Sequence, residues 1–214
     1  MKPSQKPKSK RKDTVRRILD TAAKVFAELG FAGARMDNIA QRSDVNKATI
    51  YYHIGDKNTL YTRVLHELFA SAGDQLESAL QHSDAPEEQL SIYIQQIALL
   101  LDQNPYKATM MLREITDRVE HIPKMVAEDL AAIIDKLKKI LSEGEKQGCF
   151  SHANPFTIHF MVIGAFILYK ANQPLRRQIV RLQGSVKNPG AAVCGAYANE
   201  VERLVLRSLK TDSK

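Results

Sequence analysis

The side chains best suited to a binding chemistry lie in one short stretch, residues 47–53, with the sequence KATIYYH. Ile50 and Ile54 are four residues apart and predict the buried side of a helix, so the two adjacent tyrosines face the opposite side. The major groove of B-DNA admits one helix whose small or polar residues approach base edges while flanking donors bind phosphates. The pattern therefore favours a DNA contact, although such a helix can also form a protein interface.

Two short helices joined by a tight turn would position these side chains. The spacing predicts one helix over 36–42 and a second over 47–53, with a turn at 43–45 and Asn46 as the cap of the second helix. This is the helix-turn-helix plan. On it, Ala48, Thr49 and Tyr51 approach the bases. The expected phosphate contacts are Lys47, Tyr52, His53 and Lys57.

The rest of the chain is expected to be helical, because no stretch alternates as a strand would. A helix over 13–29 supports the pair, and a long helix over 57–80 reaches beyond the resulting three-helix unit and bridges to a second one. Further helices are expected over 86–102, 104–118, 123–148, 155–172 and 190–209. The fold class is all-α. The expected parts are a basic tail (1–12), a helix-turn-helix domain (13–56) and a helical ligand-binding and dimerisation domain (57–214).

The formal charge of +7 is concentrated at the N-terminus. Residues 1–12 hold six lysines and arginines and no acid, so the remaining chain is nearly neutral. A segment this basic and this poor in apolar side chains is expected to be disordered. It either lies along a nucleic-acid backbone or acts only as a solubilising tail.

Several function classes are excluded by what the sequence lacks. The two cysteines, Cys149 and Cys194, are too far apart for a zinc motif, and no metal or cofactor is expected. No nucleophile–base spacing, paired carboxylates or glycine-rich phosphate loop predicts an enzyme. The longest apolar run, residues 156–169, is too short to span a membrane, and no export signal is present, so a cytoplasmic protein with no membrane partner is expected.

Residues 16–65 closely resemble the DNA-binding domain of the tetracycline-repressor (TetR) family of bacterial transcription regulators. The matching residues are Ile18-Leu19, Ala22-Ala23, Phe26, Gly30-Phe31, Ile39-Ala40, Val45, Thr49-Ile50-Tyr51-Tyr52-His53, Lys57 and Leu60. The resemblance implies a homodimer, a ligand-responsive C-terminal domain and repression of nearby genes.

Three positions depart from the family's commonest pattern. Asp44 replaces the usual glycine of the turn, but aspartate tolerates the left-handed conformation better than most residues. Arg35 stands where a capping serine or threonine often contacts phosphate. It cannot cap the helix, but it can reach a phosphate directly. Ile54 replaces the usual phenylalanine, which is a change within the core.

The C-terminal part offers candidate residues for a ligand cavity and for a dimer interface. Small residues at helical spacing allow close approach of helices from two subunits, or equally within one subunit. The dimer candidates are Gly164, Ala165, Ala192, Gly195, Ala196 and Asn199. Methionine and aromatic side chains suit an irregular apolar cavity, although each can be ordinary core. The cavity candidates are Tyr93, Ile97, Met110, Met111, Ile115, Phe160, Phe166 and Tyr169. His159, alone on an apolar helix, either orients a ligand or is a satisfied core histidine.

The sequence thus predicts a dimeric, sequence-specific regulator, most simply a repressor that a small and largely apolar effector releases from a palindromic operator in double-stranded DNA. Two recognition helices would then read successive major grooves of the palindrome. The alternative is an architectural DNA-binding protein that needs no effector, which the basic tail favours.

Overall fold

The structure of this chain, a computed structural model, describes residues 6–104, 106, 109, 110, 112, 113, 123–183 and 192–211. Throughout these residues the regular elements are helices, and the only extended pairing is an isolated bridge between Phe150 and Lys210. The predicted all-α class is confirmed. The helices are α1 (Lys6–Gly33), α2 (Met36–Arg42), α3 (Lys47–His53), α4 (Lys57–Leu80), α5 (Pro86–Gln103), α7 (Lys124–Lys146), α8 (Pro155–Ala171), α9 (Gln173–Gln183) and α10 (Ala196–Leu209).

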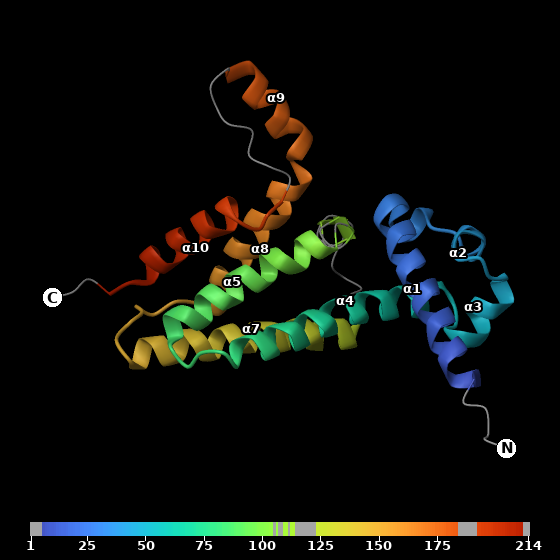
Figure 1. Cartoon of the computed structure of the whole chain (residues 1–214), viewed down its shortest axis with the longest axis horizontal. Coiled ribbons are helices and arrows are strands. Elements are labelled where there is room, and N and C mark those ends of the chain that lie inside the picture. The colour runs from blue at the N-terminus through green and yellow to red at the C-terminus, as the bar shows by residue number, and fades with distance from the viewer. Residues whose placement is uncertain are drawn as a thin grey trace.

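Helices α1, α2 and α3 form a small N-terminal unit at one end of the molecule (Figure 1). The first helix begins at Lys6, inside the stretch for which the sequence predicted a disordered tail, so the described part of that tail is helical. The predicted stop at Gly30 is confirmed, because this residue takes φ 70° and ψ 173° and interrupts the helix. One more turn follows before Met36 opens α2 at the expected residue.

The long helix α4 bridges two separate cores, as the sequence predicts. Its first half buries Leu60, Val64 and Leu65 in the core of the N-terminal unit. Its second half buries Leu76 in a larger core that also holds residues of α5, α7, α8 and α10. We call the part of the molecule around this larger core the helical body. One continuous helix is therefore buried in both cores.

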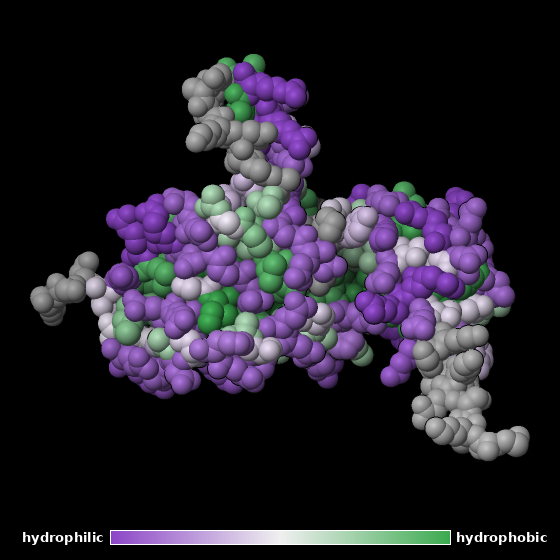
Figure 2. Space-filling view, in the orientation of Figure 1, coloured by the Kyte–Doolittle hydropathy of each residue, from purple (hydrophilic) through white to green (hydrophobic). Residues whose placement is uncertain are grey.

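The helical body is an elongated bundle in which α4, α5 and α7 run side by side (Figure 1). One contact in it is unusually close: an added Cβ on Gly144 of α7 would lie 2.0 Å from Cδ2 of Phe150, so only glycine fits there. Apolar surface interrupts the polar surface on the visible face of the body (Figure 2). Helix α9 projects away from the bundle instead of packing along it (Figure 1).

The boundaries after α8 differ from the expected ones. The helix ends at Ala171, and Pro174 then lies in the first turn of α9, where a proline needs no hydrogen-bond partner. Helix α10 begins at Ala196, six residues later than expected. The carboxylate of Asp102 explains this, because it accepts the N–H groups of Val193 (3.0 Å) and Cys194 (2.8 Å) and holds them in a turn. Most of the helix expected over 104–118 lies outside the described residues.

Candidate functional site

The outer face of α3 carries the exposed aromatic side chains that the sequence singled out. Ile50 is fully buried and Ile54 is 5% exposed, which confirms the predicted inner side of the helix. On the other side, Tyr51 is 48% exposed and Tyr52 is 81% exposed. Lys47 and Ala48 are also exposed on this helix. A seven-residue helix with two large aromatic rings in solvent presents a contact surface rather than a core.

The turn and cap that hold α3 form as expected. Asn46 Oδ1 accepts the backbone N–H of Thr49 at 2.7 Å, which is the predicted cap, and it also accepts the hydroxyl of Thr49 at 2.7 Å. Asp44 takes φ 51°, so the turn keeps its left-handed residue without glycine. The buried hydroxyl of Ser43 donates to the carbonyl of Ile39 at 2.6 Å. Arg17 of α1 also donates to the carbonyl of Asp44 at 3.4 Å. The turn between α2 and α3 is therefore stabilised by a hydrogen bond to α2 and by another from α1.

Two of the candidate phosphate contacts have protein partners in this structure. Lys47 Nζ lies 3.0 Å from Asp37 Oδ2, and this hydrogen bond raises the pKa of the Lys47 ammonium. Lys57 Nζ donates to the carbonyl of Ala32 at 3.3 Å and lies 4.6 Å from the ring centroid of Phe31. A phosphate would have to compete with Asp37 for Lys47, whereas Lys57 also joins the start of α4 to the end of α1.

The remaining candidates occupy the edges of the same face. Arg35 is exposed and precedes α2 in an extended conformation without a side-chain cap, as expected for arginine. The Nδ1 atom of His53 is buried and has no hydrogen-bond partner among the described residues. Arg63 of α4 donates to the carbonyl of His53 at 3.3 Å. Arg63 and Arg17 were missed by the sequence reasoning, because both belong to other helices and only the fold brings them to the ends of α3.

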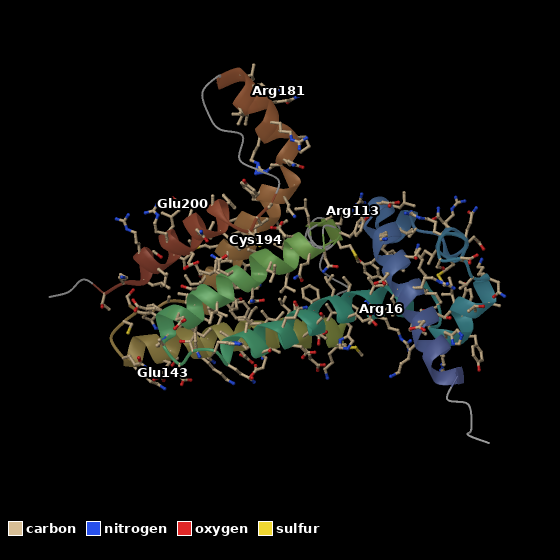
Figure 3. All side chains as sticks on the ribbon, viewed as in Figure 1. Arg16, Arg113, Glu143, Arg181, Cys194 and Glu200 are labelled. Atoms are coloured by element: carbon tan, nitrogen blue, oxygen red, sulfur yellow. The ribbon has the colours of Figure 1, made fainter. Side chains whose placement is uncertain are left out.

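A second set of contacts joins the helical body to the N-terminal unit. Met110 is 2% exposed and Val126 is 3% exposed, and both belong to the core of the N-terminal unit. Arg113 Nη2 donates to the carbonyl of Glu28 of α1 at 3.0 Å (Figure 3). The assignment of Met110 to a ligand cavity is therefore corrected. Its sequence position between two body helices concealed that the chain returns to α1 at this point.

An apolar cavity of about 50 Å³ lies between four helices of the body. It is lined by Leu68, Phe69, Ala72 and Leu76 of α4, Gln96, Ile97, Leu100 and Leu101 of α5, Leu130 and Ile133 of α7, and His159 and Ile163 of α8. The lining is aliphatic apart from Phe69, Gln96 and His159, and none of these residues is charged.

Among the predicted cavity residues, the structure brings only Ile97 to this cavity. Tyr93, Phe166 and Tyr169 are buried in the surrounding core without lining it. Phe160 is 54% exposed on the outside of α8, so its assignment to the cavity is corrected. Met111 and Ile115 lie outside the described residues.

A buried hydrogen bond connects one cavity residue to the core. The hydroxyl of Tyr93 lies 2.6 Å from Nδ1 of His159, and the exposed fractions of these residues are 0% and 3%. Burial lowers the pKa of His159 to about 4 and raises the pKa of Tyr93, so both side chains are uncharged near neutral pH. His159 is therefore a satisfied core histidine, one of the two roles that the sequence left open, and it also lines the cavity.

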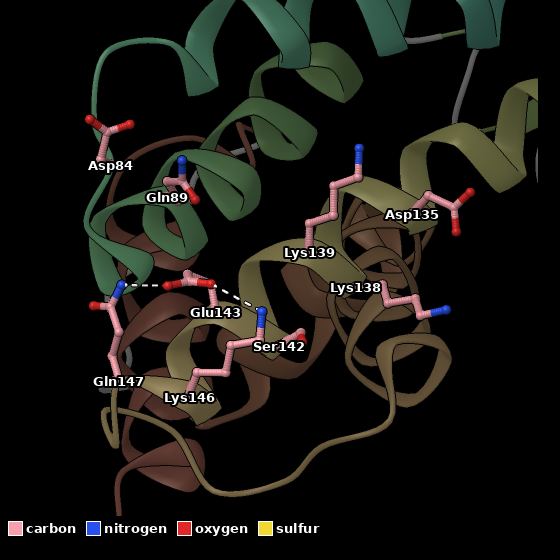
Figure 4. Close-up of a pocket in the computed structure, with 9 residues that line it drawn as sticks. All are labelled: Asp84, Gln89, Asp135, Lys138, Lys139, Ser142, Glu143, Lys146 and Gln147. Carbon is pink, nitrogen blue, oxygen red and sulfur yellow. Dashed lines mark hydrogen bonds and ion pairs between the residues drawn. The ribbon is translucent and has the colours of Figure 1, made fainter.

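A larger hollow of about 850 Å³ lies at the surface between α7 and the loop before α5 (Figure 4). Its side chains are polar, and Glu143 accepts from Gln147 at 2.9 Å and from Lys146 at 3.5 Å. Lys138 and Lys139 line the same hollow and point away from each other (Figure 4). These side chains form a solvated face rather than a built binding site.

The small residues expected at a dimer interface lie at or near the surface. Ala192, Gly195, Ala196 and Asn199 are exposed, and Ala165 is half-buried. Around Gly164 no described atom, apart from the adjacent residues and the nearby backbone of its own helix, lies within 4 Å of the position of an added Cβ. Ala165 packs against the core of the helical body, and Asn199 accepts a hydrogen bond from Gln95 at 3.0 Å, so these two residues also make contacts within one chain.

An apolar stripe accompanies these residues on α8. Phe156, Phe160 and Leu168 are 55%, 54% and 53% exposed, and with Gly164 they repeat every four residues along one face. On α10, Leu204 is 52% exposed. The sequence reasoning missed this stripe, although a signal existed: residues 156–169 are apolar on nearly all sides of the helix, and the described residues of the chain bury only one of these sides.

Two family profiles match this chain. The profile described as "Bacterial regulatory proteins, tetR family" matches residues 18–64, which span α1 to the start of α4. The profile described as "Tetracyclin repressor-like, C-terminal domain" matches residues 86–186. Among curated relatives, the HTH-type transcriptional repressor NicS of Pseudomonas putida is 28% identical over 167 residues, which cover 73% of this chain and 75% of NicS.

Solved structures share the fold at lower identity. A mutant of HlyIIR with a linker in place of residues 169–186 of its own chain has a TM-score of 0.69 at 21% identity, covering 94% of this chain and 100% of that one. FadR from Bacillus subtilis, solved with stearoyl-CoA, has a TM-score of 0.65 at 18% identity, covering 89% and 97%. AibR, solved with isovaleryl coenzyme A and operator DNA, has a TM-score of 0.59 at 19% identity, covering 92% and 98%.

Among the described residues, no group of three or more histidine, cysteine or acidic side chains is placed to hold a metal ion. Within the same residues, no helix combines the length and the apolar composition required to cross a bilayer.

Proposed function

Because the chain belongs to the TetR family of bacterial regulatory proteins, we propose that it is a dimeric repressor that a small and largely apolar ligand releases from a palindromic operator. At the level of the family it is a ligand-responsive, DNA-binding transcription regulator. The observation that carries the proposal is the outer face of α3, where Tyr51 and Tyr52 are exposed on a capped helix. We place its action in the cytoplasm.

On this proposal α3 lies in the major groove. Ala48 and Tyr51 offer apolar contacts to thymine methyl groups. The hydroxyl proton of Thr49 is donated to Asn46, so its oxygen is left to accept a hydrogen bond from a base amino group. Tyr52 stands furthest into solvent and suits a phosphate. The other phosphate contacts are Arg35, Lys47, His53 and Lys57.

Dimerisation through α8 and α10 would bring two copies of α3 to one side of the assembly. The exposed stripe of Phe160 and Leu168, with Gly164 between them, supplies the apolar surface that such an interface buries. Two copies of α3 related by a two-fold axis can read half-sites about 34–36 Å apart, or a multiple of that distance. Since the two half-sites are then related by the same axis, the operator is a palindrome.

Ligand binding and DNA binding are coupled through α4 and the return contact on α1. Leu68, Phe69, Ala72 and Leu76 line the cavity from α4, whose first half is buried in the N-terminal unit. A cavity of about 50 Å³ is too small for most effectors, so a ligand must push the helices apart. The shift would move the N-terminal unit through α4 and change the spacing of the two α3 helices. Coupling of this kind is reciprocal, so DNA must weaken ligand binding equally.

The structural relatives support an apolar effector. FadR of Bacillus subtilis was solved with stearoyl-CoA, and AibR with isovaleryl coenzyme A and operator DNA. None of the described residues that line the cavity is charged, so the cavity suits the acyl part of such a molecule rather than its phosphates. The effector class proposed from this is a molecule with an apolar chain.

The DNA-binding proposal is tested by selecting bound duplexes from a random pool with the full-length protein, and then by titrating substituted proteins. Recovery of a palindromic consensus supports specific, dimeric binding. Tyr51→Ala is expected to lose about 1–3 kcal/mol on the consensus and to relax its sequence preference. Tyr52→Phe is expected to weaken binding to the consensus and to random DNA alike, because it removes a phosphate contact.

The matched control is Tyr106→Phe, since Tyr106 is 39% exposed and lies outside α3. It should leave both affinities unchanged. If Tyr51→Ala binds the consensus and random DNA as tightly as the original protein does, the proposed orientation of α3 in the groove is wrong.

The small cavity favours one alternative, an architectural DNA-binding protein without an effector. The two functions are separated by measuring operator affinity with and without stearoyl-CoA or isovaleryl-CoA. A fall in affinity with either compound supports the ligand-controlled repressor. Steep salt dependence with little sequence preference, unchanged by both compounds, supports the architectural protein.

A further inference from the structure

The buried pair of Tyr93 and His159 has a defined proton arrangement. The phenol carries one proton, and the 2.6 Å distance places its oxygen in hydrogen-bond contact with Nδ1 of His159. If the imidazole donated from Nδ1, the phenol proton would need a second acceptor, and no other partner of this hydroxyl is found within the described residues. Donation by Nδ1 would leave both the phenol proton and the Nε2 lone pair without partners, whereas donation by the phenol leaves only the Nε2 N–H, so the phenol donates and Nδ1 accepts.

This arrangement determines which ring nitrogen of His159 carries the proton. A neutral imidazole has one N–H, and with Nδ1 accepting, the proton is on Nε2. His159 lines the apolar cavity, and among the described lining residues Gln96 is the only other one with a hydrogen-bonding side chain. Tyr93 thus holds the imidazole with its single N–H on Nε2, the ring nitrogen that Tyr93 does not occupy.

The residues that line the cavity restrict which ligand groups can accept a hydrogen bond from Nε2 of His159. A carboxylate entering the cavity would lose its water without meeting a cation, because none of the described lining residues is charged. A ketone, ester or thioester carbonyl accepts the same hydrogen bond without carrying a charge. Ile97 and Ile163 are each four residues beyond a member of the pair on α5 and α8, and both line the cavity with the aliphatic side chains of α4 and α7.

We propose that His159, positioned by Tyr93, selects an effector with an apolar chain and one uncharged carbonyl group, and rejects the corresponding carboxylate. This inference rests on the proposed function, because it names the ligand class of the cavity through which release from DNA would occur. His159 is the group that contacts the ligand. Tyr93 is a positioning residue that acts through the imidazole.

The first test uses the unsubstituted full-length protein and reads the imidazole directly. Nitrogen-15 NMR of histidine-labelled protein distinguishes protonated from unprotonated ring nitrogens. The expected result is a neutral His159 with its proton on Nε2, and a shift of that resonance when methyl hexanoate is added. A proton on Nδ1, or no response to methyl hexanoate, overturns the proposal.

The second test compares methyl hexanoate with hexanoate, two probes that share one acyl chain, by calorimetry at pH 7.5. The ester is expected to bind at least tenfold more tightly than the carboxylate. His159→Leu should remove this preference by weakening the ester at least tenfold. His159→Gln should retain most of it, because the glutamine amide can place an N–H near the position of Nε2. Equal binding of the two probes by the unsubstituted protein overturns the proposal.

Failure of the inference and failure of the proposed function have different outcomes. If the ester binds preferentially but leaves operator affinity unchanged, the ligand selectivity stands and the proposed release mechanism fails. If both probes release the operator equally, the release mechanism stands and the selectivity for an uncharged carbonyl fails.

Discussion

Acidification is expected to destabilise the folded protein through His159 in particular. Burial lowers the pKa of this imidazole from the ordinary value of 6.5 to about 4. The unfolded chain therefore binds more protons than the folded chain between these two values, and the free energy of unfolding falls as the pH falls. Stability is fully present above pH 6.5 and is lost progressively as the pH drops towards 4.

The size of the effect follows from the shift. One pKa unit corresponds to about 1.36 kcal/mol, so lowering the pH from 7 to 4.5 should remove about 2 kcal/mol of unfolding free energy through this residue alone. Within the described part of the chain no other titratable side chain lines the cavity beside His159, and the hydroxyl of Tyr93 stays protonated over this range.

The assay is urea unfolding followed by circular dichroism at pH 7, 6, 5 and 4.5, at one fixed protein concentration because the proposed dimer makes stability concentration-dependent. His159→Gln is the matched control, since glutamine cannot titrate but keeps a polar side chain at the site. Carboxylates elsewhere contribute equally to both proteins, so the difference between the two pH profiles isolates His159. Parallel profiles would show that the imidazole is not buried as an uncharged group and would refute the reasoning.

Three further substitutions test the packing and the turn. Gly144→Ala should cost about 1–3 kcal/mol of unfolding free energy by forcing a methyl group against Phe150, and adding Phe150→Leu should recover part of the loss, as thermal denaturation can show. Asp44→Val should destabilise the protein by about 1–2 kcal/mol because a β-branched residue tolerates φ 51° poorly, whereas Asp44→Asn should be nearly neutral in the same measurement. Asn46→Ala removes the cap of α3 and should cost about 1 kcal/mol in urea unfolding while weakening operator binding, whereas full stability with full binding would show that the cap is dispensable.

The N-terminal unit could be derived from the sequence because its determinants are local. The bounds of α2, α3 and α4 agree with the expected ones, since each start is marked by a cap or a stripe of apolar residues a few positions away. The inner and outer sides of α3 followed from the four-residue spacing of Ile50 and Ile54. The start of α1 at Lys6 was not predicted. A basic composition suggested disorder, but it does not prevent a segment from extending a helix that forms next to it.

The cavity could not be derived in the same way, because its lining is decided by how four helices are oriented around one another. Ile97 and Phe160 look equally suitable in the sequence, yet one lines the cavity and the other is 54% exposed on the opposite side of its helix. Met110 was misplaced because the chain folds back onto α1, a contact that no local pattern predicts.

What the sequence determined by itself is the helical class, the family resemblance of residues 16–65 and the side of α3 that faces solvent, all of which depend on neighbours within a few turns of the chain. Only the tertiary structure decided that Tyr93 meets His159, 66 residues away, and that Met110 joins the N-terminal core. Helical periodicity specifies which residues share a face. The packing of the helices determines which residues of other helices contact that face, and the chemistry of the proposed ligand site depends on this packing.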